Sequence, residues 1–243
     1  VPELKIQVVS CEDYFKLNGC SSNVFSNTLF WNRPADPDCR DDVQYYRLYF
    51  STRADADTTG FQLLKDNITD TVYVDQGLPS FARCYRLTAV DRSGNESVFS
   101  EQVCNDNCPN YQLPNVFTPG NGDDCNDTFS AFSDRLFTTG ETMQLKCGNG
   151  EVTEEVLRAI NASCPRFVLK VDFRVVNRWG KEVFTYSSGG EKSIYIDWDG
   201  RDNNGNDLPS GTYFYVATVT FVTLDPKQSV KTIKGWVQLV RGD

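Results

Sequence analysis

The sequence predicts an all-β protein built from two tandem β-sandwich domains, and three observations support this prediction. First, long stretches of the chain alternate between apolar and polar residues or are rich in β-branched and aromatic residues, as strands are. The clearest of these stretches are residues 43–50, 85–90, 167–176 and 213–222. Second, clusters of turn-forming residues separate them, at residues 91–94, 177–180 and 203–206. Third, a helical pattern is confined to one segment.

That segment covers residues 153–162 and predicts one short helix. Thr153 can cap its first turn, where Glu154 and Glu155 complement the positive end of the helix dipole. A short apolar stripe follows, formed by Val156, Leu157 and Ile160. Short strands at regular spacing with a single helix are typical of β-sandwiches.

The boundary between the two domains is predicted near residues 104–109 (CNDNCP). Closely spaced cysteines among Asn, Asp and Pro suit a tight linker better than the interior of a strand. We therefore expect one domain at residues 1–107 and a second at residues 108–243. Each stretch is long enough for a sandwich of about seven strands.

The composition argues against several functions. The chain of 243 residues carries 24 Lys and Arg against 33 Asp and Glu, a formal net charge of −9, so we expect it to repel nucleic acids. It contains no histidine, which removes the commonest general base, and we expect no enzymatic activity. The longest apolar run, residues 213–222, is shorter than the ~20 residues of a membrane-spanning helix, so no transmembrane segment is expected.

Three motifs of the first domain occur in the order of a known module, at residues 28–31 (TLFW), 46–50 (YRLYF) and 84–97 (CYRLTAVDRSGNES). They resemble the second, third and sixth strands of a fibronectin type III module. In such a strand, Cys84 would point away from the core by alternation. The residues that would face the core are Tyr85, Leu87 and Ala89. The resemblance implies a spacer or an adhesive unit.

Four motifs follow one another in the second domain, at residues 113–129 (LPNVFTPGNGDDCNDTF), 175–184 (VVNRWGKEVF), 198–215 (WDGRDNNGNDLPSGTYFY) and 234–241 (KGWVQLVR). In this order they are similar to the gliding-motility-associated C-terminal domain, the type B sorting signal of the type IX secretion system of Bacteroidota. The resemblance implies an immunoglobulin-like sandwich. An insertion at residues 130–163, which contains the predicted helix, departs from the family pattern.

The second resemblance implies a function and a route. The domain at residues 108–243 would be a secretion address on an exported protein, recognised by the outer-membrane type IX translocon and by a barrel of the PorP/SprF type. The protein would pass through the periplasm to the cell surface, and the chain would be a mature or excised piece of it. The first domain would be a spacer. The alternative is an adhesive or carbohydrate-binding module, which would need exposed aromatic side chains on one sheet face.

The residues of the second domain also have a local structural explanation. Asn204 and Gly205 predict a two-residue type I′ hairpin turn, because both residues tolerate a positive φ. Trp179 and Trp198 flank turns, and we expect both to plug the ends of the sandwich.

One loop has the composition of a calcium site. Asn121, Asp123 and Asp127 offer three side-chain oxygens within seven residues, and calcium accepts irregular loops that are rich in oxygen ligands. The alternative is a loop whose side chains bond their own backbone. Residues 199–206 have the same two interpretations, and there a hairpin turn already explains the Asp and Asn residues. No other cofactor is expected.

Nine cysteines predict disulfides in an oxidising compartment, since scattered thiols without histidine make a poor zinc site. The odd number leaves at least one thiol without a partner inside the chain. In the second domain two of Cys125, Cys147 and Cys164 are expected to pair. The preferred pairs are Cys11–Cys20, Cys39–Cys84, Cys104–Cys108 and Cys147–Cys164.

Overall fold

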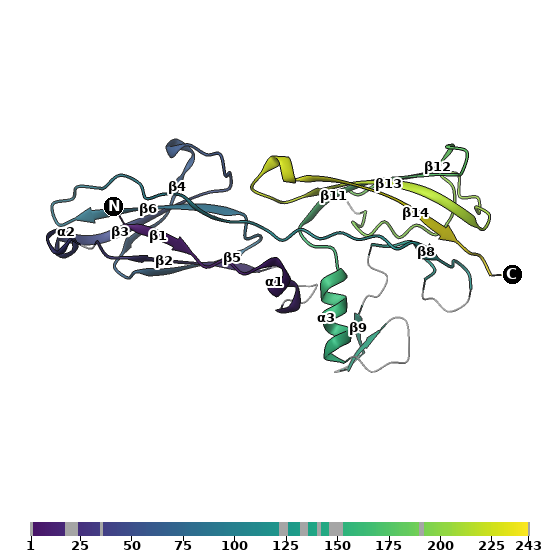
Figure 1. The fold of residues 1–243 in the computed structure, drawn as a ribbon, viewed down its shortest axis with the longest axis horizontal. Coiled ribbons are helices and arrows are strands. Elements are labelled where there is room, and N and C mark those ends of the chain that lie inside the picture. Colours follow the sequence, from purple (N-terminus) through teal and green to yellow (C-terminus); the bar gives the residue numbers. More distant parts are fainter. Residues whose placement is uncertain are drawn as a thin grey trace. The chain divides into compact units, whose positions relative to one another are not determined.

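The computed structural model describes residues 2–17, 24–34, 36–121, 126–131, 136–139, 142–145, 153–189 and 192–242. The chain forms two compact units, and the main break between them lies between Asn107 and Cys108 (Figure 1). The first unit contains Val1–Cys11, Ser21–Asn107 and Thr223–Pro226. The second contains Glu12–Cys20, Cys108–Val222 and Lys227–Asp243.

The first unit is a sandwich of a three-stranded sheet, in the order β1-β2-β5, and a four-stranded sheet, in the order β4-β3-β6-β7. All neighbours in both sheets are antiparallel. The fibronectin type III-like, all-β fold predicted for this part of the chain is confirmed. The strands are β1 (Glu3–Ile6), β2 (Phe25–Asn32), β3 (Val43–Ser51), β4 (Gln62–Ile68), β5 (Val72–Leu78), β6 (Arg83–Asp91) and β7 (Val103–Asn105).

The core of the first unit follows the predicted alternation. Tyr85 and Leu87 of β6 are fully buried between the sheets, where Trp31 of β2 packs edge-on against Tyr46 of β3 at 5.4 Å between ring centroids. Cys84 points to the opposite face of β6, as expected, but it is fully buried there as well. It belongs to a second, smaller cluster with Phe61, Ala82 and Leu224.

A buried polar network joins the two sheets of this unit. The Asp75 carboxylate of β5 accepts a hydrogen bond from the Tyr85 hydroxyl (2.7 Å) and forms an ion pair with Arg83 (3.0 Å). Asn27 of β2 donates to the Tyr85 oxygen (2.8 Å) and accepts from the Asn105 side chain of β7 (2.8 Å). Burial raises the pKa of the Tyr85 hydroxyl, which therefore stays protonated and donates. Such a satisfied network favours one alignment of the sheets.

The prediction of a single helix is wrong, because two further short helices occur in the described residues. The predicted helix is present as α3 (Glu154–Ser163), and Thr153 caps it by accepting from the Val156 N–H (3.3 Å). The additional helices α1 (Cys11–Leu17) and α2 (Pro37–Asp42) have seven and six residues, too few to show a helical period. Two 3₁₀ turns, η1 (Thr58–Gly60) and η2 (Pro226–Gln228), complete the helical segments.

One disulfide joins directly opposite residues of neighbouring strands, Cys84 of β6 and Cys104 of β7. The predicted pairs Cys39–Cys84 and Cys104–Cys108 are therefore wrong. Strands β3 and β6 run antiparallel, with Ser51 opposite Cys84 at one end. Cys39 lies in α2, before the other end of β3, and eight strand residues separate the two ends by roughly 25 Å.

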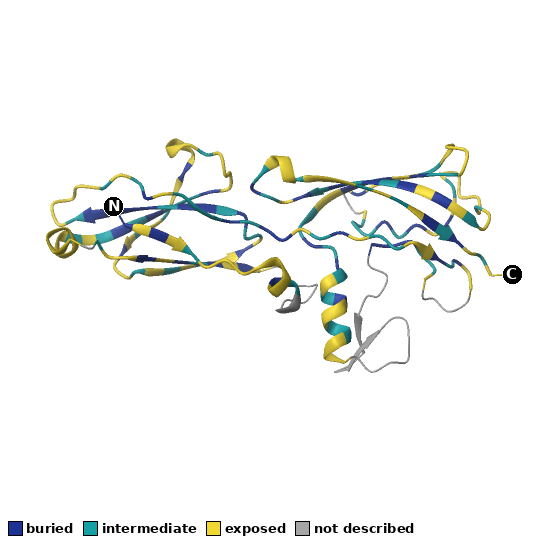
Figure 2. Cartoon of the chain, in the orientation of Figure 1, coloured by how far each residue is buried: buried dark blue, intermediate teal, exposed yellow. Residues whose placement is uncertain are grey.

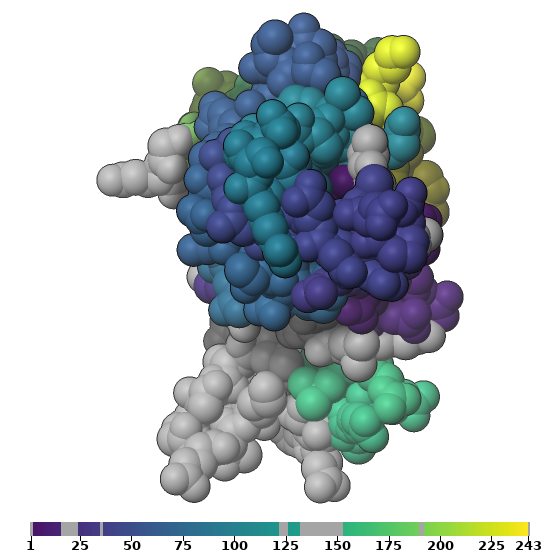
Figure 3. Space-filling model, turned by 90° about the vertical axis from the view of Figure 1, so that its left-hand side faces the viewer, coloured from purple at the N-terminus to yellow at the C-terminus, as the bar shows by residue number. Residues whose placement is uncertain are grey.

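Cys39 has a free, exposed thiol. Its helix, α2, lies at the end of the first unit that faces the viewer in Figure 3, beside the teal turn that follows β6. There the Arg92 N–H donates to the Asp42 carbonyl (3.1 Å).

Cys11, Cys108 and Cys164 are each disulfide-bonded. The pairs Cys11–Cys20 and Cys147–Cys164 stay predictions, since Cys20, Cys125 and Cys147 lie outside the described residues.

The second unit is organised around a five-stranded sheet in the order β12-β11-β13-β14-β8. Its pairs are antiparallel except β14 with β8, which is parallel. A separate hairpin of β9 and β10 occurs in the predicted insertion. The strands are β8 (Val116–Phe117), β9 (Leu136–Thr139), β10 (Thr142–Leu145), β11 (Val168–Val176), β12 (Glu182–Ser187), β13 (Gly211–Phe221) and β14 (Val230–Leu239).

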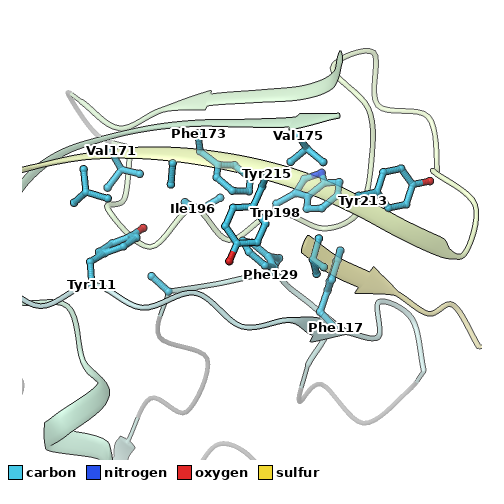
Figure 4. Packing of buried hydrophobic residues seen from close by; sticks show 14 of the residues in the cluster. Tyr111, Phe117, Phe129, Val171, Phe173, Val175, Ile196, Trp198, Tyr213 and Tyr215 are labelled. Atoms are coloured by element: carbon cyan, nitrogen blue, oxygen red, sulfur yellow. The ribbon is translucent and has the colours of Figure 1, made fainter. Parts of the chain in front are cut away.

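An aromatic core lies on one face of this sheet. Figure 4 shows Phe173 and Tyr215 on the strands, approached from the opposite layer by Phe129. The Phe129 ring lies 5.4 Å from the rings of both. That layer is mostly irregular and is held by single β-bridges such as Phe129 with Trp198. Along β13 buried residues alternate with exposed or half-buried ones, as Figure 2 shows, so the other sheet face is accessible to solvent.

The segment near the N-terminus contributes to the second unit, which the sequence did not predict. Tyr14 of α1 is buried, and the guanidinium of Arg166 lies 5.0 Å from the centre of its ring. Arg166 is itself buried, where it donates to the Asn161 carbonyl (3.0 Å). Because 152 residues separate Tyr14 from Arg166, no local sequence pattern indicates this contact.

We expect the Cys84–Cys104 disulfide to stabilise the chain. Replacing both residues by Ser should lower the free energy of unfolding by about 3 kcal/mol, as for other disulfides that close loops of this size, here with a sequence separation of 20. Denaturant unfolding measures the loss. Cys39→Ser is the matched control and should change stability by less than about 0.5 kcal/mol. A Cys39–Cys84 peptide in a non-reducing digest would contradict the assignment.

Candidate functional site

Three hairpin turns of the protein have the same hydrogen-bonding pattern, and one of them lies within residues 199–206, for which a hairpin turn and a calcium loop are the two interpretations. The turns are residues 91–95, 177–181 and 202–206. In each, the first N–H donates to the carbonyl of the fifth residue, and the fourth residue is a glycine with positive φ. The side-chain oxygen of the first residue, Asp91, Asn177 or Asp202, accepts from the third and fifth N–H groups. This is a three-residue hairpin loop with a glycine bulge.

The type I′ turn predicted at Asn204–Gly205 is therefore wrong. Gly205 has φ 83°, but Asn204 does not have a positive φ. The Asp202 carboxylate explains the difference, since it accepts the N–H groups of Asn204 and Asn206 (2.9 Å each) and so stabilises the longer loop. The N–H and side chain of Asn206, and then the Asn204 N–H, hold the pKa of Asp202 below its usual range. The carboxylate oxygens of Asp202 are therefore occupied by hydrogen bonds within the turn.

The predicted calcium loop is described in part. Asp127 accepts from the Gly120 N–H (3.1 Å), and the Asn121 amide donates to the Thr118 hydroxyl (3.0 Å). Asp123 lies outside the described residues. Within the residues that the structure describes, no group of three or more His, Cys, Asp or Glu side chains could hold a metal ion. Calcium binding at Asn121, Asp123 and Asp127 stays a prediction.

Trp198 occupies the core, as predicted. It is 1% exposed, stacks on Phe184 at 5.3 Å and donates its indole N–H to the Arg201 carbonyl (2.7 Å). The neighbouring loop is fixed from the chain end, because the Arg241 guanidinium donates to the Gly200 carbonyl (2.8 Å). The motif at residues 198–215 thus has a structural role.

Trp179 does not plug the sandwich, and that prediction is wrong. Its side chain is 75% exposed, and the Arg178 guanidinium lies 4.2 Å from its ring centre. The last strand pair before the turn joins Val176 to Glu182, so Trp179 lies beyond the end of the sheet at the tip of the hairpin. The three-residue loop, in which Asn177 accepts the Trp179 N–H (3.0 Å), places it there.

A row of apolar side chains crosses the solvent face of the sheet next to this hairpin. Phe214 of β13 lies directly opposite Trp236 of β14, and on its other side it faces Val176 of β11. Phe214 is 46% and Trp236 50% exposed. Paired residues share a face of a sheet, so these three side chains are neighbours. We call Val176, Trp179, Phe214 and Trp236 the outer aromatic patch.

Cations surround the outer aromatic patch. Arg174 and Lys234 flank Val216 in the next cross-strand row, and Arg178 and Lys181 lie in the hairpin turn. Arg174 lies 3.9 Å from the Glu182 carboxylate. Among the described residues, the other three cations have no carboxylate within 4 Å, the limit for an ion pair. The region is therefore locally positive on an acidic chain.

A hollow of about 530 Å³ adjoins the row of Arg174 on the same sheet. Asp172, Arg174, Thr185 and Ser187 contribute to its lining. Lys170 and then Ser187 hold the pKa of Asp172 below its usual range, so Asp172 is ionised and paired at neutral pH. The hollow therefore extends the exposed face of the sheet beyond the patch, and its lining is partly polar.

Gly235 shapes the other side of the patch. It lies opposite Tyr215, and a Cβ atom on Gly235 would come within 2.5 Å of the Tyr215 hydroxyl oxygen. The missing side chain lets the Tyr215 ring lie over β14 inside the core, while the next residue, Trp236, points outward. Gly235 thus makes room for a core ring directly beside a residue of the exposed patch.

A known protein family matches the part of the chain that contains these surfaces. Residues 144–239 match the CHU_C type IX secretion signal domain. The outer aromatic patch and its cations all lie within this signal domain. The family resemblance predicted from the motifs is confirmed for this range. No protein of curated function matches the chain.

Solved structures also resemble the chain. An Fn3-like protein from Clostridium thermocellum has 24% identity, covers 43% of this chain and 88% of its own, with a TM-score of 0.30. The third fibronectin III domain of human KIAA0343 protein has 16% identity, covers 42% of this chain and 80% of its own, with a TM-score of 0.27. Dimeric latent PorU from Porphyromonas gingivalis has 14% identity, covers 90% of this chain and 18% of its own, with a TM-score of 0.29. At such scores we infer nothing from them about function.

Within the described ranges, no helix combines the length and the apolar character that crossing a membrane requires.

We expect Gly235→Ala to destabilise the signal domain. The added methyl group would displace the Tyr215 ring from β14, and overpacking of this kind costs about 1–3 kcal/mol. Gly211→Ala is the matched control, because a Cβ atom there meets nothing within 4 Å and its φ is not positive. Thermal melting compares the two variants. Equal melting temperatures would contradict the packing argument.

The calcium prediction is tested by melting the protein in calcium and in EDTA. If the loop binds the ion, the wild type should melt higher in calcium, and Asp127→Ala should remove that difference. If Asp127 serves the turn alone through the Gly120 N–H, its loss should cost about 1 kcal/mol in either buffer. Identical wild-type curves in the two buffers would exclude the ion.

Proposed function

We propose that residues 108–243 are the sorting signal of an exported cell-surface protein, read by the type IX secretion machinery. The observation that carries the proposal is the match of residues 144–239 to the signal domain family. The proposed partners are the outer-membrane translocon and a barrel of the PorP/SprF type, and the proposed destination is the cell surface or the extracellular space. The proposed mode of action is binding, which is supported by the lack of histidine and by the engagement of Asp202 in a turn and of Asp172 in an ion pair.

The first unit is proposed as a spacer between the signal and an upstream passenger. Its buried network from Asn27 to Asp75 ties together strands of both sheets, and the Cys84–Cys104 disulfide joins β6 to β7 within one sheet. Such a unit resists local opening, and it can hold a passenger at a fixed distance. An oxidising compartment such as the periplasm supports the disulfides.

A carbohydrate-binding or adhesive module is the second candidate. It is favoured by one observation, the exposure of Phe214 and Trp236 on one sheet face. Aromatic rings on such a face stack on sugar rings through their apolar surfaces. Binding of the chain to immobilised polysaccharides, lost on replacing these two residues, would support this function in place of sorting.

The proposed function is tested by export of a reporter. A fluorescent protein fused upstream of residues 1–243 should reach the surface of a host that exports type IX cargo, as detected by protease accessibility on intact cells. The control is the reporter alone with the same periplasmic leader, which should stay inside. Retention of the fusion in the periplasm, while the host exports its own cargo, would contradict the proposal.

A further inference from the structure

The outer aromatic patch has the composition of the centre of a protein–protein interface. Trp and Arg are the residues most enriched among those that dominate binding energy, and here Trp179 and Trp236 lie beside Arg174 and Arg178. The patch also includes Phe214, whose ring has no stacking partner among the described aromatic pairs. Its rings are therefore available to a partner.

The charges around the patch specify the partner further. Arg178, Lys181 and Lys234 lack a carboxylate partner in the described part of the chain, although the chain as a whole has a formal net charge of −9. Lys234 pairs with Val216, in the cross-strand row next to the Phe214–Trp236 pair on the same face of the sheet. A cation therefore lies beside the apolar centre of the patch. A partner that presents carboxylates around an apolar segment would complement both features.

A second copy of this chain does not have that chemistry. Two copies that met through this face would bring Arg178, Lys181 and Lys234 of one against the same cations of the other. Like charges across an interface are unfavourable, and the repulsion grows as water is excluded. Like-charge repulsion therefore disfavours a symmetric dimer through this face, and the cations favour an acidic partner.

We propose that the type IX machinery reads the sorting signal at the outer aromatic patch, through an acidic protein segment that packs on Trp179, Phe214 and Trp236. This inference rests on the proposed function and names the surface through which it acts. The side chains of Phe214 and Trp236 project outward from strands whose inward neighbours build the core, so the patch is assembled only when the domain folds. A signal read there reports a folded domain.

The test uses the upstream reporter fused to the full chain. Trp179→Ala alone and Phe214→Thr with Trp236→Thr should each reduce the reporter at the surface, at least about tenfold, because truncating a central interface Trp typically weakens affinity by about 30-fold. Threonine retains strand propensity at the two sheet positions. The matched control is Phe30→Thr with Val72→Thr, an exposed cross-strand pair of the first unit that should leave export unchanged.

Charge variants provide a second, independent arm that does not alter packing. Arg178→Glu with Lys234→Glu should reduce export in the same assay, whereas Lys65→Glu, an exposed strand lysine of the first unit, should not. Circular dichroism melting of each purified chain shows that it is folded. If an aromatic variant fails to fold, the charge variants decide the question.

The outcomes separate the inference from the proposed function. Loss of export for the patch and charge variants, with normal export for both controls, supports the inference. Wild-type export with equal export of all variants overturns the inference and leaves the proposed function intact. Normal export of the patch variants with loss of binding to an acidic polysaccharide would assign the face to a glycan and also overturn it. Retention of the wild type overturns both.

Discussion

The second unit depends on the period-two alternation of β13, the central strand of the five-stranded sheet, which is paired on both sides. Its inward residues Tyr213 and Tyr215 pack in the aromatic core with Trp198 and Phe129. A shift of one residue would move every one of them to the solvent face. The same register that buries these rings therefore commits Phe214 to water. Exposure of the patch and burial of the core are two results of one constraint.

Alternation is local in sequence, and what depends on it alone could be predicted. Alternation predicted that Cys84 and Tyr85 lie on opposite faces of β6, and the resemblance to the fibronectin module predicted which face is inward. The capped helix α3 was predicted from its own residues, and Trp198 was placed at the end of the sandwich because it flanks a turn. Trp179 could not be placed in this way, because a Trp beside a turn lies either on the last strand pair or at the tip. The length of the loop decides between them. Here the Asn177 side chain fixes that length by accepting two backbone N–H groups, a contact that residue types alone do not reveal.

The disulfide shows where prediction from a resemblance stopped short. Strands β3 and β6 are neighbours, yet the preferred pair Cys39–Cys84 joins opposite ends of this strand pair. Antiparallel direction alone would have excluded Cys39–Cys84, since the start of one strand faces the end of the other. The true partner of Cys84 depends on the register of β7, a strand of three residues with too few positions to show a period. Nothing in its sequence could have set that register.

The net charge of −9 supports the expectation that the chain repels nucleic acids, but it conceals a local feature. A sum over the chain cannot show that β11 and β14, separated by more than fifty residues in sequence, bring Arg174 and Lys234 onto one face of a sheet. Beside exposed aromatic rings these cations have a second consequence. An exposed apolar patch attracts any other apolar surface, including that of a second copy. Positive charges around it oppose self-association and nevertheless admit a partner of opposite charge. The acidic remainder of the surface would repel such a partner, so recognition would be confined to the cationic face.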